Sequence, residues 1–191
     1  MKTDTAIVTS HSANLARLRQ VLFSSEHHSV YAILDGASVS GLLNKLYAAK
    51  EEWACLYRGQ LEPDLAEVAP YLVKLREASE FTQWLLEKGW GKHWGIFVVT
   101  PVGLEALRRH LRQFLRVKDF TGKTLYFRYY DPRVLEVYLP TCRRDEIKIL
   151  YGPVLRYIAE HPQADRALVF QHDPVKIKAT TVSLLEAAQA R

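Results

Sequence analysis

The chain has 191 residues, of which 48% are hydrophobic and 25% charged, and its formal net charge is +5. This composition is typical of an ordinary folded protein and excludes disordered, collagen-like and disulfide-rich chains. Two cysteines are too few for a disulfide framework or a zinc cluster, and no stretch has the roughly 18 to 20 apolar residues of a membrane span. The N-terminus also lacks the apolar core of a signal peptide. We therefore expect a reduced, cytoplasmic protein that has no membrane partner.

Hydrophobic spacing and turn residues predict helices that alternate with strands along the chain. In the first half, we expect a helix at 10–24, a strand at 30–34, a helix at 38–50, strands at 53–57 and 71–75, a helix at 80–88 that Ser79 caps, and a strand at 94–100. In the second half, we expect a helix at 103–116, a strand at 125–130, a helix that Asp131 and Pro132 open, a helix at 144–160, a strand at 167–171 and a C-terminal helix that Ser183 caps. Such alternation favours an α/β fold, with a mixed, mostly parallel sheet flanked by helices and a small helical C-terminal appendage.

Positive charge is concentrated in one segment of the chain. Residues 108–148 contain eleven Lys or Arg and five Asp or Glu, so the whole basic excess lies there. In the predicted helix at 103–116, Arg108, Arg112 and Arg116 recur every four residues opposite the leucines, and we expect all three to face outward. A basic surface of this kind is compatible with an acidic protein partner, with nucleic acid or with solvent alone.

Two aspartates, Asp35 and Asp131, each follow a predicted strand. A pair of carboxylates could hold magnesium or perform acid–base chemistry. The simpler interpretation makes Asp35 a turn residue and Asp131 the N-cap of the helix that Pro132 begins, with Arg128 or Arg133 paired to Asp35. We assign a structural motif to five residues: Asp35, Gly36, Asp131, Pro132 and Arg133. The sequence has no phosphate-binding glycine loop and no nucleophile elbow, so we expect no enzyme activity, no cofactor and no metal.

Aromatic side chains cluster beside basic ones at residues 126–130. The cluster is similar to the stacking strands of RNA-binding sheets, but the glycines of that motif are absent. Tyr and Arg are also residues that dominate protein–protein interfaces. The candidate partner-binding residues are Arg108, Arg112, Arg116, Tyr126, Arg128 and Tyr130. The alternative function is a nucleic-acid-binding protein or nuclease that uses the basic 108–148 segment, and a small hydrolytic enzyme is a third, weaker class.

Seven short motifs follow one another in a characteristic order. They are YAILDG at 31–36, WACLY at 53–57, APYLV at 69–73, WLL at 84–86, WGI at 94–96, RHL at 109–111 and FRYYDPRVL at 127–135. Together they resemble domain-of-unknown-function family 4123, and the resemblance covers residues 30–140. It divides the chain into an N-terminal helical segment at 1–29, an α/β core at 30–140 and a short C-terminal lobe at 141–191, which is shorter than in many relatives.

The resemblance implies a cytoplasmic effector chaperone, or adaptor, of the bacterial type VI secretion system. Such a protein binds a toxic effector before export and helps to load it onto the spike, a valine-glycine-repeat protein, or onto the PAAR-repeat tip of that spike. The resemblance implies neither an enzymatic activity nor a cofactor.

Overall fold

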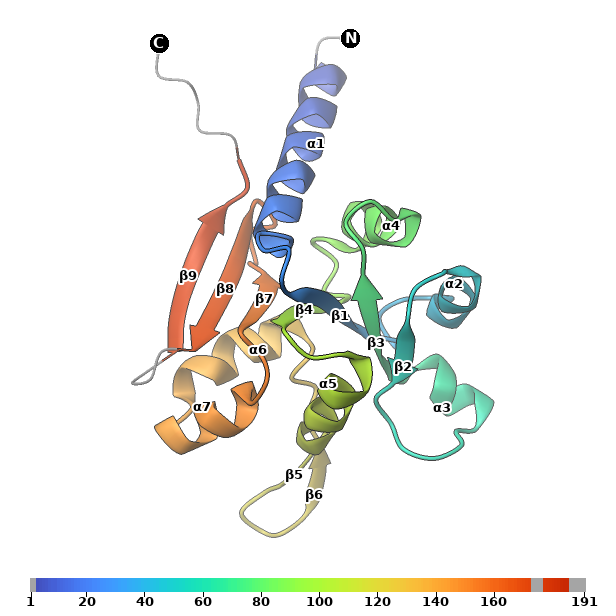
Figure 1. Cartoon of the computed structure of the whole chain (residues 1–191), viewed down its shortest axis with the longest axis vertical. Coiled ribbons are helices and arrows are strands. Elements are labelled where there is room, and N and C mark those ends of the chain that lie inside the picture. The colour runs from blue at the N-terminus through green and yellow to red at the C-terminus, as the bar shows by residue number, and fades with distance from the viewer. Residues whose placement is uncertain (1–2, 173–176, 186–191) are drawn as a thin grey trace.

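The computed structural model describes residues 3–172 and 177–185 (Figure 1). Seven strands form one sheet, in which every pair of neighbours is antiparallel. In spatial order the strands are β2 (Trp53–Cys55), β3 (Pro70–Leu75), β1 (Ser29–Asp35), β4 (Gly95–Thr100), β7 (Arg156–Glu160), β8 (Arg166–His172) and β9 (Ile177–Ser183). No helix within the described residues is long and apolar enough to cross a membrane.

The predicted mostly parallel sheet is wrong, and the connections explain why. Helix α2 (Leu42–Ala48) joins β1 to β2, and helix α4 (Glu80–Gly89) joins β3 to β4. Each helix links two strands that run in the same direction, but another strand lies between them: β3 between β1 and β2, and β1 between β3 and β4. This is the split β-α-β arrangement, which has the same strand–helix alternation in sequence as adjacent parallel strands. Between β2 and β3 there is only the short helix α3 (Pro63–Glu67).

Helices cover both faces of the sheet, so its central strands are buried on two sides. On β1, the side chains of Val30, Ala32 and Leu34 pack in one layer with α1 (Thr3–Leu22), α2 and α4. Tyr31 and Ile33 face the other layer, which contains α5 (Leu104–Leu111), α6 (Pro132–Tyr138) and α7 (Arg144–Tyr151). Because successive strand residues point to opposite faces, burial of both faces requires the continuous apolar run that the sequence has at 30–34.

The C-terminal third of the chain differs most from the prediction. The expected helix at 144–160 ends at Tyr151, where Gly152 has a φ of 45° and Pro153 follows. Residues 156–160 are instead the strand β7, which pairs with β4, so β7, β8 and β9 extend the same sheet. The predicted helical appendage is therefore wrong. Ser183 is the last residue of β9, and the remainder of the C-terminal helix expected there, 186–191, lies outside the described residues.

The predicted strand at 125–130 is also shorter than expected. Strand β6 (Thr124–Tyr126) pairs with β5 (Arg116–Lys118) to form a separate two-stranded hairpin that projects from the body of the molecule below α5 (Figure 1). Helix α5 ends at Leu111 and continues only as a 3-10 turn through Phe114. The predicted cap of α4 is confirmed, because the Ser79 side chain accepts a hydrogen bond from the Thr82 N–H at 3.1 Å.

Candidate functional site

Asp35 is buried at the end of β1, where it forms an ion pair with Arg128. Its carboxylate also accepts hydrogen bonds from the Ser38 hydroxyl at 2.8 Å and from the Ala37 N–H at 3.2 Å. Of the two arginines expected as partners, Arg128 is the one that pairs. The carboxylate is thus fully engaged in closing the turn after β1, as a buried charge must be to avoid a large desolvation cost.

Asp131 is the N-cap of α6, as predicted, and Pro132 occupies the first helical position. Its carboxylate accepts hydrogen bonds from the Arg133 backbone N–H at 3.0 Å and from two guanidinium nitrogens of Arg133 at 2.9 Å and 2.7 Å. Burial alone would raise the pKa of Asp131, but the hydrogen bonds and charge of Arg133 lower it overall. Arg128 lies 3.9 Å from the same carboxylate and so stands between both aspartates.

Gly36 allows two segments of the chain to approach closely beside the ion pair of Asp35 and Arg128. Its N–H donates to the carbonyl of Ala69 at 3.0 Å. A Cβ at this position would lie 2.5 Å from the Glu67 carbonyl oxygen, which is closer than real Cβ contacts. Only glycine fits here, because any side chain would push the two segments apart. Its absence lets the turn after β1 pack against the segment that enters β3.

Arg108 and Arg112 do not face outward, contrary to the expectation for the basic helix. The Arg108 Nε donates to the carbonyl of Cys55 at 3.0 Å, and the Arg112 Nε donates to that of Leu56 at 2.9 Å. A second Arg112 nitrogen donates to the carbonyl of Tyr57. The Cys55 carbonyl is at the end of the edge strand β2, and those of Leu56 and Tyr57 directly follow it. Guanidinium groups can satisfy acceptors that a sheet edge leaves open. Both arginines therefore fasten α5 to the end of β2.

One exposed part of the basic segment is the β5–β6 hairpin, while other exposed basic residues, such as Arg109 and Lys148, lie on α5 and α7. We define the hairpin surface as five of the exposed cationic and aromatic side chains there: Arg116, Lys118, Phe120, Lys123 and Tyr126. Phe120 is fully exposed at the tip. Phe120 was not among the predicted site residues, because a single aromatic residue in a turn has no periodic pattern. The available signal was the Asp-Phe-Thr-Gly-Lys turn that follows the basic run at 116–118.

The tip that carries Phe120 is a rigid turn. One carboxylate oxygen of Asp119 accepts hydrogen bonds from the Thr121 hydroxyl at 2.6 Å, from the Thr121 N–H at 2.9 Å and from the Lys123 N–H at 3.0 Å. The hydroxyl of Thr121 contributes most to lowering the pKa of Asp119. Gly122 adopts a φ of 83°, which other residues rarely tolerate. The turn thus holds Phe120 in solvent without a flexible loop.

Aromatic contacts connect the hairpin to the body. The ring of Tyr126 lies 6.1 Å from that of Tyr57, and the ring of Tyr130 lies 5.7 Å from that of Tyr129. Tyr130 is buried, and burial raises the pKa of its hydroxyl. Of the six predicted partner-binding residues, the structure therefore leaves Arg116, Tyr126 and part of Arg128 at the surface. Tyr130, Arg108 and Arg112 have contacts inside the protein.

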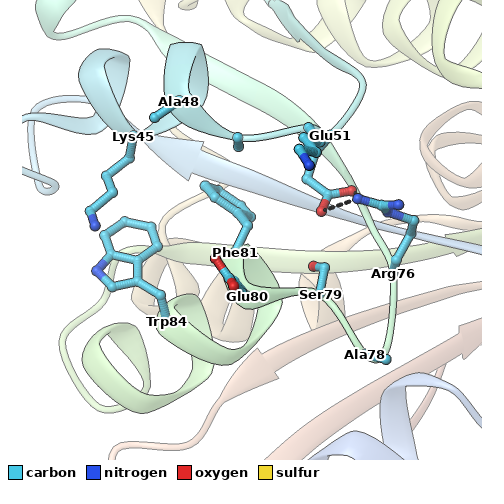
Figure 2. A pocket seen from close by; sticks show the side chains of 11 residues that line it. Lys45, Ala48, Glu51, Arg76, Ala78, Ser79, Glu80, Phe81 and Trp84 are labelled. Carbon is cyan, nitrogen blue, oxygen red and sulfur yellow. Dashed lines mark hydrogen bonds and ion pairs between the residues drawn. The ribbon is translucent and has the colours of Figure 1, made fainter.

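A groove of about 540 Å³ lies between α2 and α4, on the sheet face opposite α5 (Figure 2). Three of its charged side chains have contacts there. Arg76 binds Glu51 through two nitrogens, at 2.8 Å and 3.0 Å, and lowers the pKa of that carboxyl. Lys45 lies over the Trp84 ring, with its Nζ 5.2 Å from the ring centroid. None of the predicted site residues lines this groove.

The described residues contain no group of three or more His, Cys, Asp or Glu side chains that could hold a metal ion. Cys55 and Cys142 are partly buried, and burial raises the pKa of both thiols. A raised pKa leaves a thiol protonated near neutral pH and so a poor nucleophile. The two aspartates that could have formed a paired carboxylate site are each bound by an arginine.

These features define an antiparallel α/β protein with a split β-α-β sheet, helices on both faces and a projecting basic hairpin. The chain belongs to the family described as Domain of unknown function (DUF4123), whose family model matches residues 30–148, more than half of the chain. The matched segment begins in β1 and ends in α7, so it includes the split β-α-β unit and the hairpin. No curated protein and no solved structure matches the chain.

Proposed function

We propose that the protein is a cytoplasmic chaperone, or adaptor, that binds a toxic effector of a bacterial type VI secretion system. It helps to load this effector onto the spike protein or its PAAR-repeat tip, and it uses no cofactor and catalyses no reaction. Family membership supports the proposal through the role that the resemblance implies. The observation that carries it is the hairpin surface, where Phe120 is fully exposed on a rigid turn between Lys118 and Lys123.

An exposed aromatic side chain on a rigid turn is suited to insertion into an apolar pocket of a partner. Burying a Phe side chain stabilises a complex by roughly 1.5 to 3 kcal/mol. Because the Asp119 turn is already formed, little of this free energy is lost in ordering the loop. Arg116, Lys118 and Lys123 surround the tip with positive charge, which favours an acidic rim on the partner and speeds their encounter.

The test uses the full chain and an effector whose gene lies beside a spike gene in the same genome. Phe120→Ala should weaken effector binding by about 10- to 100-fold. This factor corresponds to losing the free energy of burying one Phe side chain. Val137→Ala is the matched control, because Val137 is also an exposed apolar residue but lies on α6. Wild-type affinity in the Phe120→Ala variant, measured by calorimetry, would exclude the hairpin as the cargo site.

Nucleic-acid binding by the basic segment is the alternative. The case for this alternative is weaker because four arginines of the segment already bind carbonyls or carboxylates of the same chain. They are Arg108, Arg112, Arg128 and Arg133. A nucleic-acid-binding protein would retain DNA or RNA on purification. Its affinity would also fall about tenfold per phosphate contact for each tenfold rise in salt concentration. Absorbance at the nucleic-acid maximum and a salt titration separate the two functions.

A further inference from the structure

The two edges of the sheet differ in how they are protected. The β2 edge is three residues long, and the carbonyls at its end are bound by Arg108 and Arg112. At the opposite edge, β9 pairs with β8 over seven residues without interruption, from Ile177↔His172 to Ser183↔Arg166. Among the described residues no strand pairs with the other side of β9. An edge of this length presents a row of backbone donors and acceptors that can bind another strand.

The side chains of β9 do not block such pairing. Edges are commonly protected by charged residues, proline, bulges or a covering element. Strand β9 has the sequence IKATTVS, with one charged residue, Lys178, and no proline. Its register with β8 has no bulge, and residues 178–181 are exposed. Ile177, Thr180, Thr181 and Val182 are β-branched, which favours an extended strand.

We propose that β9 pairs antiparallel with β9 of a second copy of the chain, around a two-fold axis at Thr180. This register aligns all seven residues of each strand: Ile177 with Ser183, Lys178 with Val182, Ala179 with Thr181, and Thr180 with its own copy. Each Lys178 then lies opposite a valine, so no like charges face each other. The two-fold interface is self-complementary and removes the free edge of both sheets.

The length and charge of β9 are the reasons to assign a second copy: an identical seven-residue strand covers the whole edge and places no like charges opposite each other. Opposed residues of an antiparallel pair point to the same face, so the two-fold pair can slip only by two residues, and such a slip would align five residues instead of seven. Strand β9 also lies at the outer edge of the sheet, away from the hairpin (Figure 1). The inference therefore goes beyond the proposed function and does not depend on it.

The first test measures the mass of the full chain by light scattering over a range of concentrations. We expect the mass to rise from 22.0 kDa to twice that value. Thr180→Glu places two carboxylates opposite each other at the axis and should raise the dimer dissociation constant by about tenfold or more. The matched control is Thr124→Glu, an exposed threonine in the hairpin strand β6. A wild-type chain that stays monomeric, or a dimer that Thr180→Glu leaves unchanged, would overturn the proposal.

The second test reads the register directly through disulfide formation. In the proposed dimer, Thr180→Cys places two thiols opposite each other and should form an intermolecular disulfide under mild oxidation. Thr181→Cys places its two copies at diagonal positions, about 7 to 8 Å apart, which a disulfide does not span. The unaltered chain controls for Cys55 and Cys142. Equal cross-linking of the two variants would exclude this register, and cross-linking of neither would exclude the strand pair.

Discussion

The basic segment contains arginines of two kinds, although they look alike in the sequence. Arg112 and Arg128 bind groups of the same chain: carbonyls after β2 in one case and the buried Asp35 in the other. The cationic residues of the hairpin surface, such as Arg116 and Lys118, are exposed on a projecting strand. The two kinds differ in whether a hydrogen-bond acceptor from another element lies close enough to the side chain to bind it. A cluster of positive charge thus includes structural residues, and only part of it is available to a partner.

The largest effect should come from breaking the pair between Arg128 and Asp35. Arg128→Met leaves a buried carboxylate without its cation, which costs roughly 3 to 5 kcal/mol when both groups are buried. Because the Arg128 side chain is 46% exposed, we expect about 2 to 3 kcal/mol in the free energy of unfolding by denaturant titration. Arg116→Met is the matched control, because Arg116 is an exposed arginine of the same basic segment. An equal loss in both variants would contradict the special role of Arg128.

Removal of the α6 cap should have a smaller effect than loss of Arg128. Asp131→Ala should lower the free energy of unfolding by about 0.5 to 2 kcal/mol at neutral pH. Because folding lowers the pKa of Asp131, its carboxylate stabilises the fold above the ordinary pKa of 3.8, and this contribution is lost as the pH falls below that value. The difference between wild type and variant should therefore shrink in acid. A difference that stays constant from pH 7 to pH 3, measured by denaturant titration, would contradict the lowered pKa.

Arg112 and Arg116 provide a direct comparison of the two kinds of arginine. Arg112→Met removes the donors to the carbonyls of Leu56 and Tyr57, and we expect a loss of about 1 to 2 kcal/mol. Arg116→Met changes an exposed side chain and should stay within about 0.5 kcal/mol of the wild type. Thermal unfolding of both variants measures the contrast. If Arg116→Met is the more damaging, the division between structural and exposed arginines is wrong.

Charge reversal on the hairpin should have only a small effect on stability. Changing Arg116, Lys118 and Lys123 together to Glu should leave the free energy of unfolding within about 1 kcal/mol, because all three side chains are exposed. The same variant should associate more slowly with an acidic effector, and its association rate should no longer fall with added salt. Stopped-flow or surface-binding kinetics measure both quantities. A wild-type rate and salt dependence would leave these charges as solvated groups without a role in binding.

Local pattern predicted most elements of the fold, but not the direction of the strands. The strand at 30–34 and the caps by Ser79 and Asp131 depend on neighbouring residues, so sequence alone identifies them. The interposed strand of the split β-α-β unit depends on pairings such as Val30↔Leu75, which no local signal encodes. Residues 156–160 are buried, and a short apolar run of this kind does not distinguish a strand from a helix.

The candidate site was predictable to a similar extent. The pair between Asp35 and Arg128 was expected as one of two alternatives, because both residues flank predicted strand ends. The contacts of Arg108 and Arg112 with the body of the protein were not expected, because their acceptors at residues 55–57 are more than fifty positions away in the sequence. Helical periodicity placed these side chains opposite the leucines, but it contains no information about an edge strand that lies beside that face.

The position of β4 has a consequence for how the chain emerges from the ribosome. Strands β1 to β4 can pair with one another as soon as Thr100 is available, but β4 gains its second neighbour only when β7 has been made. At 5 to 20 residues per second, synthesis of residues 101–155 takes roughly 3 to 11 s. During that interval the uncharged segment GIFVVT is a temporary sheet edge. Aggregation of nascent chains should therefore begin at this strand, and truncation before Arg156 should yield insoluble protein.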